Sequence, residues 1–285
     1  MLGGFAVRGP GFAITTKLAR TSVDLLGYLA VNGKTPQRRE KVSELLWPDR
    51  PEHQSRSALS TAIWRIDKAF SEAGFDDSFS IEVRHQSTIA LALGTDVRID
   101  CVELAGSVED ASRELQAGLN LSESVRHRLI DALAAWAGDF LEGSRSDWAA
   151  REQERFRSIR IRGLIAMMRD YAAKGMIEYA LECGSEVLAV DELREATQRE
   201  VMWLYVMNGQ RCKAIIQYRL LKQRLRDELA VDPMPDTTHL YQHILDGGDA
   251  PSAFTPTSVT GILREHEQRR ARIYSAISAI PRPDA

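Results

Sequence analysis

The chain has few cysteines, no long apolar run and little net charge, and each absence excludes a class of protein. Its three cysteines, Cys101, Cys183 and Cys212, are odd in number and widely spaced, unlike a disulfide framework or a zinc site. We expect buried free thiols. No stretch approaches the ~18 apolar residues of a membrane span, and the first residues lack the basic start and apolar run of a signal peptide. We therefore expect a cytoplasmic protein with no membrane partner.

Motifs for catalysis, for a metal and for a cofactor are also missing. The paired glycines Gly3 and Gly4 lack the lysine and the helix start of a phosphate-binding loop. His239 and His243 have metal-ligand spacing on a helix, but no third ligand accompanies them, so two surface histidines are the simpler interpretation. We expect a protein that is not an enzyme and that binds neither a metal nor a cofactor.

The net charge of −3 excludes a surface covered with nucleic-acid-binding residues. Residues 1–99 nevertheless hold 13 Lys and Arg against 11 Asp and Glu, so the N-terminal third is slightly basic while the rest is acidic. A nucleic-acid partner is permitted if its contacts are local to that third, but the asymmetry alone does not demonstrate one.

The segment from Pro51 to Gly74 is the most informative part of the chain, because its apolar residues occupy only one helical face. At about 100° per residue, one stripe contains Leu59, Ile63, Ile66 and Phe70. The opposite side carries Gln54, Ser57, Thr61, Trp64 and Lys68. The pattern predicts a helix whose apolar stripe packs against the protein and whose other face reads a partner.

The flanking segments predict the rest of a DNA-binding fold. Alternating residues indicate strands over 79–84 and 88–93, with a short turn between them. The elements expected earlier are short strands within residues 4–17 and helices over 22–32 and 36–47. Three helices followed by a hairpin are the layout of a winged helix-turn-helix.

Side chains suited to DNA gather on these elements. A helix in the major groove needs hydrogen-bonding groups for base edges and cations for phosphates. On the predicted recognition helix these residues are Arg56, Ser57, Thr61, Trp64, Arg65 and Lys68. The start of the second helix offers phosphate contacts from Arg38, Arg39 and Lys41, and the wing offers Arg84, His85 and Gln86.

Two residues of this helix are unusual for a DNA-recognition helix. Trp64 lies on the outward side, where it either contacts thymine methyl groups or sugars or packs beneath the wing, and we favour packing beneath the wing. Asp67 is placed to pair with Arg56 or Lys34 rather than to face DNA.

Beyond residue 99 the pattern is continuously helical to about residue 247, and part of it repeats. The motif Tyr171-x3-Gly175-x4-Ala180 recurs 34 residues later as Tyr205-x3-Gly209-x4-Ala214. That period is typical of tetratricopeptide helical hairpins, although an ordinary helical bundle is the alternative. The expected segments are a winged-helix domain over 1–98, a tetratricopeptide-like domain over 99–246, a linker over 247–261, and a tail over 262–285 with an amphipathic stretch at 262–280.

Several motifs in order resemble one known family. In the N-terminal part they are Leu2-Gly-Gly-Phe5, Leu25-Leu-Gly-Tyr-Leu-Ala30, Leu45-Leu-Trp-Pro-Asp49 and Ala58-Leu-x3-Ile63-x-Arg65-Ile66. Later ones are Trp136-Ala-Gly-Asp-Phe-Leu-Glu-Gly143, the WAAREQER run over 148–155, and Asp227-Glu-Leu-Ala-Val-Asp-Pro233. Over residues 1 to about 246 the chain resembles the Streptomyces antibiotic regulatory protein (SARP) family, in which an OmpR-type winged helix precedes a bacterial transcriptional activator domain.

The resemblance implies a mainly α protein with a small β component and a role as a transcriptional activator. It implies binding to direct repeats in double-stranded DNA as a pair of protomers, contact with RNA polymerase, and a place on the nucleoid when DNA is bound. It places Ser57, Thr61, Arg65 and Lys68 at the DNA-facing positions, whereas Asp67 departs from the family's usual basic residue. The alternative is a tetratricopeptide-like adaptor whose winged helix binds protein.

Overall fold

The computed structural model describes residues 1–9, 12–15, 18–33, 35–74, 79–84, 87–118 and 120–247, and these pack as two compact units. Unit 1 consists of residues 1–109 and 128–160, and unit 2 consists of residues 110–127 and the chain from residue 161. Three helices contribute to both units, namely α4 (Asp100–Gln116), α5 (Glu123–Ala134) and α6 (Asp147–Ala173). The units therefore divide the chain differently from the domains expected over 1–98 and 99–246, and that domain boundary stays a prediction.

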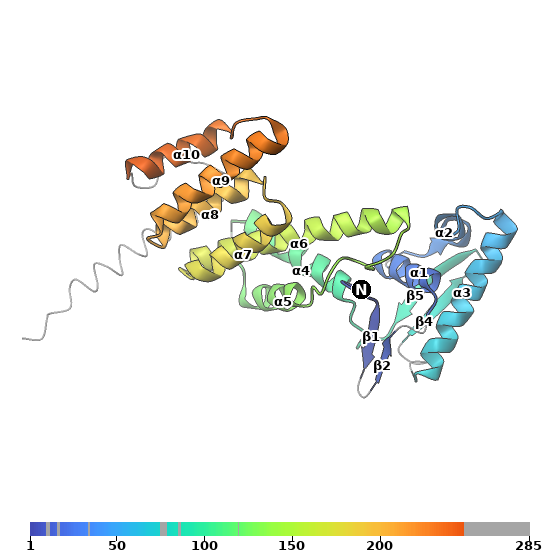
Figure 1. The fold of residues 1–285 in the computed structure, drawn as a ribbon. Coiled ribbons are helices and arrows are strands. Elements are labelled where there is room, and N and C mark those ends of the chain that lie inside the picture. The colour runs from blue at the N-terminus through green and yellow to red at the C-terminus, as the bar shows by residue number, and fades with distance from the viewer. Residues whose placement is uncertain are drawn as a thin grey trace, which may run out of the picture. The chain divides into compact units, whose positions relative to one another are not determined.

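Unit 1 contains the winged helix-turn-helix (Figure 1). Strands β1 (Ala6–Gly9) and β2 (Phe12–Thr15) pair antiparallel as expected. They are followed by α1 (Arg20–Val31), β3 (Gln37–Arg38), α2 (Arg39–Leu46), α3 (Glu52–Glu72), β4 (Phe79–Arg84) and β5 (Thr88–Leu93). The β4–β5 hairpin has the bounds that the alternation predicted, and its strands pair antiparallel from Phe79 opposite Leu93 to Arg84 opposite Thr88.

One expected helix begins later than predicted. The sequence places the second helix from Pro36, but Gln37 and Arg38 form β3, which pairs antiparallel with Ile89 and Thr88 of β5. The three-stranded sheet has the order β3-β5-β4. Long-range pairing outweighs helix propensity at these two residues. They form the edge of a sheet whose neighbouring strand, β5, lies about fifty residues later in the sequence.

The expected continuous run of helix after residue 99 is also interrupted. Between α5 and α6 the chain carries an isolated antiparallel bridge from Phe140 to Leu2, and the Gly3 N–H donates to the Asp139 carbonyl at 2.8 Å. Leu141 adopts a left-handed φ of 45° and is 2% exposed, since its side chain packs against Gly27 of α1. This segment therefore attaches residues of the second predicted domain to the first helix of unit 1.

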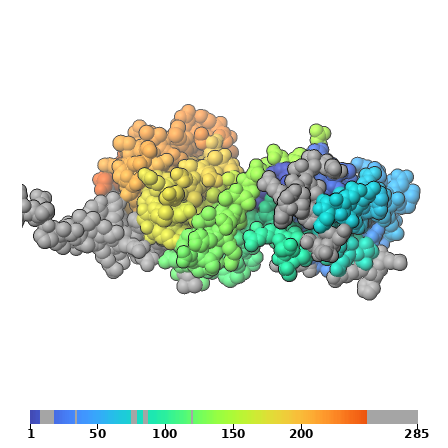
Figure 2. Space-filling view, turned by 90° about the horizontal axis from the view of Figure 1, so that it is seen from below, coloured from blue at the N-terminus to red at the C-terminus, as the bar shows by residue number. Residues whose placement is uncertain are grey.

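Unit 2 contains the helical repeat. Its later helices are α7 (Ile177–Val190), α8 (Glu195–Met207), α9 (Arg211–Leu229) and α10 (Pro235–Asp246). Figure 2 shows the surface of α7 in yellow beside the orange of the following helices, and α8 contacts both α7 and α9. No helix in the part of the chain that the structure describes has the length and apolar character needed to cross a membrane.

The two copies of the sequence repeat have the same turn geometry. Gly175 and Gly209 have φ values of 77° and 72°, which glycine adopts without a side-chain penalty. In each copy the residue after the glycine, Met176 or Gln210, donates its N–H to the carbonyl of the repeat tyrosine, at 2.9 Å and 2.7 Å respectively. Ala180 and Ala214 are both fully buried, so the small residue of each repeat lies where paired helices meet. The repeated hairpin, rather than an ordinary bundle, is what the structure contains.

A charged network ties α5 to α6 within unit 2. The Asp170 side chain is buried and accepts from Arg126 Nε at 2.7 Å and from Lys174 Nζ at 2.6 Å. Arg126 also donates to the carbonyl of Leu121, which extends the network to the residue before α5. A buried carboxylate needs such partners, because an unpaired charge in the interior is strongly unfavourable.

Close helix packing in unit 2 depends on Gly184 of α7. A Cβ atom there would lie 2.5 Å from Cγ2 of Val201 and 3.2 Å from Sδ of Met168. We predict that Gly184→Ala lowers the free energy of unfolding by about 1–3 kcal/mol through overpacking. Gly106→Ala in α4 is the control, since a Cβ there meets nothing within 4 Å, and it should be neutral or stabilising. Urea denaturation compares the two, and equal stability would contradict the prediction.

Candidate nucleic-acid interface

Helix α3 has one buried and one exposed face. Leu59, Ile63, Ile66 and Phe70 are at most 7% exposed, which confirms the predicted apolar stripe. The stripe packs because α3 contacts α1, α2 and β4, and Phe70 stacks on Phe79 of the wing strand with ring centroids 3.8 Å apart. The opposite side is exposed along its length at Gln54, Ser57, Thr61, Trp64, Arg65 and Lys68. The fold thus holds a row of polar side chains on a rigid element facing solvent.

A shallow hollow of about 530 Å³ lies along the first turns of this exposed face. Three segments line it: the first turn of α1 at Thr21, the turn after α2 at Trp47 and Arg50, and α3 from His53 to Arg65. The lining residues of α3 include Ser57 and Thr61, both predicted site residues. No ion-pair partner for Arg65 exists among the described residues, so its guanidinium is available to an anion.

Sequence reasoning missed three polar residues of this hollow that could contact a ligand: Thr21, Arg50 and His53. Thr21 and Arg50 lie outside the recognition helix, and His53 falls beside its predicted outward face. A helical projection shows which residues share one helix face, but not which turns of neighbouring segments border it. The Trp-Pro-Asp-Arg-Pro run before α3 marks a turn, and a basic residue in the turn leading into a recognition helix is the signal that could have identified Arg50.

Three of the predicted cations are already engaged within the protein, and one of them, Lys68, pairs with Glu72 one turn along α3 at 3.8 Å. Arg56 pairs with Glu40 of α2 at 2.7 Å and with Glu52 of α3 at 2.6 Å, and all three side chains are about half exposed or more. Arg39 Nη2 donates to the Ser60 hydroxyl at 2.8 Å. Exposed ion pairs of this kind contribute little stability and can exchange for a phosphate, but they reduce the positive charge that the face presents.

The remaining predicted contacts lie partly within and partly outside the described residues. Arg38 is exposed in β3 rather than on a helix, which corrects its placement, and Lys41 is exposed on α2. Arg84 is the last residue of β4, opposite Thr88 in the register. His85 and Gln86 lie outside the described residues. Arg38 therefore joins the sheet of the wing through the β3–β5 pairing, and Lys41 lies on α2, which packs against α3.

Trp64 does not pack beneath the wing, contrary to our expectation. Its side chain is 60% exposed, and Lys68 Nζ lies 5.1 Å from the ring centroid in a cation–π arrangement. Helical phase accounts for the difference, because Trp64 lies on the side of α3 opposite Phe70, which is the aromatic residue that does meet the wing strand. A large aromatic ring thus stands in the middle of the outward face.

Asp67 does not pair with Arg56, which also corrects the expectation. Partial burial raises the pKa of the Asp67 carboxyl, while a hydrogen bond from the Ile81 N–H of β4 acts in the opposite direction. The carboxylate therefore ties α3 to the wing. Lys34, the other partner considered, lies outside the described residues.

The cysteines differ in environment. Cys101 is buried and Cys183 half-buried, and burial raises the pKa of each thiol to about 12. Cys212 is exposed, so the expectation of three buried thiols is wrong for this residue. It lies on the outer side of α9, where helical phase turns it away from the buried Ala214 and Tyr218.

The Asp67 contact predicts a pH effect. Because folding raises the pKa of Asp67 above its usual value of 3.8, the folded protein binds this proton more readily than the unfolded chain. The free energy of unfolding therefore falls as the pH rises from the usual pKa of Asp67 to its raised pKa in the folded protein. Asp67→Asn keeps an acceptor for the Ile81 N–H and should remove this pH dependence, whereas Asp67→Ala should lose the hydrogen bond and about 1 kcal/mol.

Urea unfolding near pH 4 and near pH 7 measures this effect. Asp96→Asn is the control, because Asp96 is an exposed carboxylate after β5. The assignment would be wrong if Asp67→Asn and Asp67→Ala had the same stability at both pH values.

Comparison with known proteins agrees with this architecture. The model of the bacterial transcriptional activator domain matches residues 99–245. The transcriptional regulatory protein MoaR1 of Mycobacterium tuberculosis is 27% identical over 232 residues, which are 78% of this chain and 70% of MoaR1. The regulatory protein AfsR of Streptomyces coelicolor is 26% identical over 275 residues, which are 91% of this chain but 26% of AfsR.

A solved structure shows the same fold. Mycobacterium tuberculosis EmbR, in complex with a low affinity phosphopeptide, superposes with a TM-score of 0.74 at 17% identity, over 96% of this chain and 69% of EmbR. That likeness concerns the fold, a winged helix with a tetratricopeptide-like helical part. The family match over residues 99–245 and the similarity to MoaR1 and AfsR show that the chain belongs to the SARP family of transcriptional regulators.

Proposed function

We propose that this regulator is an activator that binds double-stranded DNA by placing the outward face of α3 in the major groove. The observation that carries the proposal is the geometry of α3, whose buried stripe fixes the opposite row of polar side chains toward solvent. Ser57 and Thr61 suit base edges, and Arg65 suits guanine or a phosphate. An α-helix is the element that the major groove accommodates.

The hollow beside α3 supports a phosphate contact at the start of the recognition helix. Arg50, His53 and Arg65 line it from two segments, so cationic or hydrogen-bonding groups converge on one place. Arg38, Arg39 and Lys41 would hold a neighbouring phosphate, and Arg84, His85 and Gln86 would contact the flanking groove through the wing. Local charge of this kind is compatible with the overall charge of −3, because only the interface needs to be basic.

The helical repeat is proposed to serve protein contacts. Tetratricopeptide-like hairpins stack into extended binding surfaces, and α9 exposes Ile216 and Leu220 one turn apart at 54% and 47%. The family resemblance implies two protomers on repeated promoter elements and contact with RNA polymerase. Both partners are proposals for this chain.

One observation favours a second candidate, a winged helix that binds protein. Trp64 is exposed in the centre of the outward face, and Arg56 is paired with two carboxylates. Trp is frequently among the few residues that contribute most of the binding free energy at a protein interface. This candidate is an adaptor in which the same face meets a protein partner.

Arg65→Ala tests the DNA proposal. We expect it to weaken binding to a DNA site selected from a random library by about 1–3 kcal/mol and to reduce the salt dependence by about one counterion. Arg162→Ala is the matched control, because Arg162 is an exposed arginine on α6 outside the proposed interface. Fluorescence anisotropy at several salt concentrations measures both. Equal affinities for the two variants would refute the role of Arg65.

Trp64→Ala separates the two candidates. If α3 reads DNA, the variant should lose affinity for the selected site by roughly 1 kcal/mol and tolerate base changes at one position, because an apolar contact to a thymine methyl is lost. Its stability should not change, since the ring is exposed. If the adaptor is correct, DNA binding is absent or unaltered, and a nuclease-resistant protein complex is lost instead.

A further inference from the structure

A small cluster of ionic and polar contacts joins the start of α2 to the second turn of α3. Figure 1 shows α2 beside the first turns of α3, and the two helices pack together. Nη2 of Arg56 lies 2.7 Å from Oε1 of Glu40 on α2 and 2.6 Å from Oε1 of Glu52, one turn earlier on α3. Beside them, Arg39 donates to the Ser60 hydroxyl at 2.8 Å, and that hydroxyl donates to the Arg56 carbonyl at 3.1 Å. Both arginines of this junction are thus held by groups of the protein itself.

Arg56 borders the outward face of α3 and is open to solvent. Helical phase places it about 60° from Leu59, which is buried, and about 100° from Ser57, which is exposed. The Arg56 side chain is 49% exposed, and the side chains of Glu40 and Glu52 are 62% and 65% exposed. An anion arriving from solvent can therefore reach the guanidinium, and both carboxylates have room to turn away from it.

The two carboxylates take the place of a phosphate on this guanidinium. Arginine binds carboxylate and phosphate oxygens through the same short, charge-assisted hydrogen bonds. A phosphate contact by Arg56 therefore requires Glu40, Glu52 or both to leave, and a carboxylate that stays nearby repels the DNA backbone. Arg65 needs no such exchange, because no ion-pair partner for it exists among the described residues. Exposed ion pairs are weak, so the exchange should cost a few-fold in affinity rather than abolish the contact.

We propose that Glu40 limits the DNA affinity of this regulator by holding Arg56 in competition with the DNA backbone. The inference rests on the proposed function, because it concerns the edge of the face of α3 that is placed in the major groove. A phosphate contact carries no sequence information, so Glu40 lowers the affinity for every DNA sequence alike. Its effect is to reduce the amount of protein held on non-specific DNA, while Ser57 and Thr61 keep their role at the base edges.

A double-mutant cycle on DNA binding by the full chain tests the proposal. Glu40→Gln keeps the shape of the side chain and removes its charge. We expect it to tighten binding to a selected site and to unrelated DNA by the same factor, about 2–5-fold. In an Arg56→Ala background the same substitution should have no effect beyond that of the control.

Glu44→Gln is the matched control. Glu44 is an exposed glutamate one turn later on α2, and no ion-pair partner for it exists among the described residues. Its substitution removes the same charge from the same helix without releasing Arg56, so it should tighten binding by less than Glu40→Gln does. Glu52→Gln removes the other partner of Arg56 and should act in the same direction as Glu40→Gln.

Fluorescence anisotropy at a fixed salt concentration measures the affinities. Urea denaturation checks that each variant is folded, because Glu40 and Glu52 lie in the first turns of their helices, where a carboxylate is stabilising. Unchanged or weaker binding by Glu40→Gln would overturn the proposal. So would a gain equal to that of Glu44→Gln, or one that persists without Arg56, since repulsion alone would then explain it. These results leave the DNA proposal intact if Arg65→Ala weakens binding, whereas a native chain that binds no DNA refutes both.

Discussion

The burial of one stripe of α3 is the constraint on which the remainder of unit 1 depends. Leu59 and Ile66 are completely buried, and Phe70 stacks on the wing strand, so α3 can neither rotate about its axis nor slide along the sheet without exposing apolar area. Burying side chains of this size stabilises the fold by about 1.5–3 kcal/mol each. The outward face is therefore held in one orientation, and the hydrogen bond from Ile81 to Asp67 fixes the wing relative to it.

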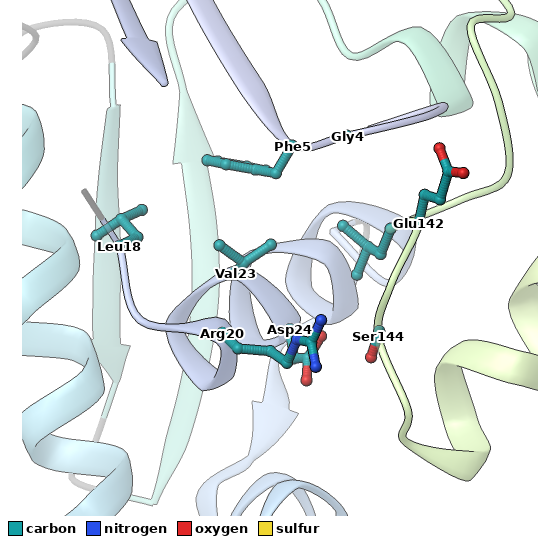
Figure 3. A pocket seen from close by; sticks show the side chains of 9 residues that line it. Gly4, Phe5, Leu18, Arg20, Val23, Asp24, Glu142 and Ser144 are labelled. Atoms are coloured by element: carbon teal, nitrogen blue, oxygen red, sulfur yellow. The ribbon is translucent and has the colours of Figure 1, made fainter. Parts of the chain in front are cut away.

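A second structural element explains a motif that is otherwise difficult to interpret. The Trp-Ala-Gly-Asp-Phe-Leu-Glu-Gly run over 136–143 is neither helix nor regular strand, yet Phe140 and Leu141 are buried and bridge to the start of the chain. Gly27 lets Leu141 approach, since a Cβ on Gly27 would lie 2.4 Å from its Cδ1. The motif is thus a docking segment within unit 1, and its Glu142 also lines a cavity of about 330 Å³ that Asp24 of α1 borders (Figure 3).

Most of the features that could be predicted from the sequence follow from its local periodicity. The buried stripe of α3, the bounds of β4 and β5, and the 34-residue repeat all arise from patterns within a few turns or strands. The errors arose where distant segments meet. Gln37 and Arg38 became a strand through β5, Trp64 stayed exposed because Phe70 took the contact with the wing, and Arg50 joined the site from a neighbouring turn. Domain boundaries and partners need information that such patterns do not contain.

The central claim is that the outward face of α3 lies in the major groove of DNA, and chemical protection by dimethyl sulfate tests it most directly. The reagent methylates guanine N7 in the major groove and adenine N3 in the minor groove, so one experiment reports both grooves. On a selected binding site, the full chain should protect guanine N7 positions, and repeated half-sites should be protected on one side of the duplex. Protection confined to adenine N3, or no protection at saturating protein, would contradict the account.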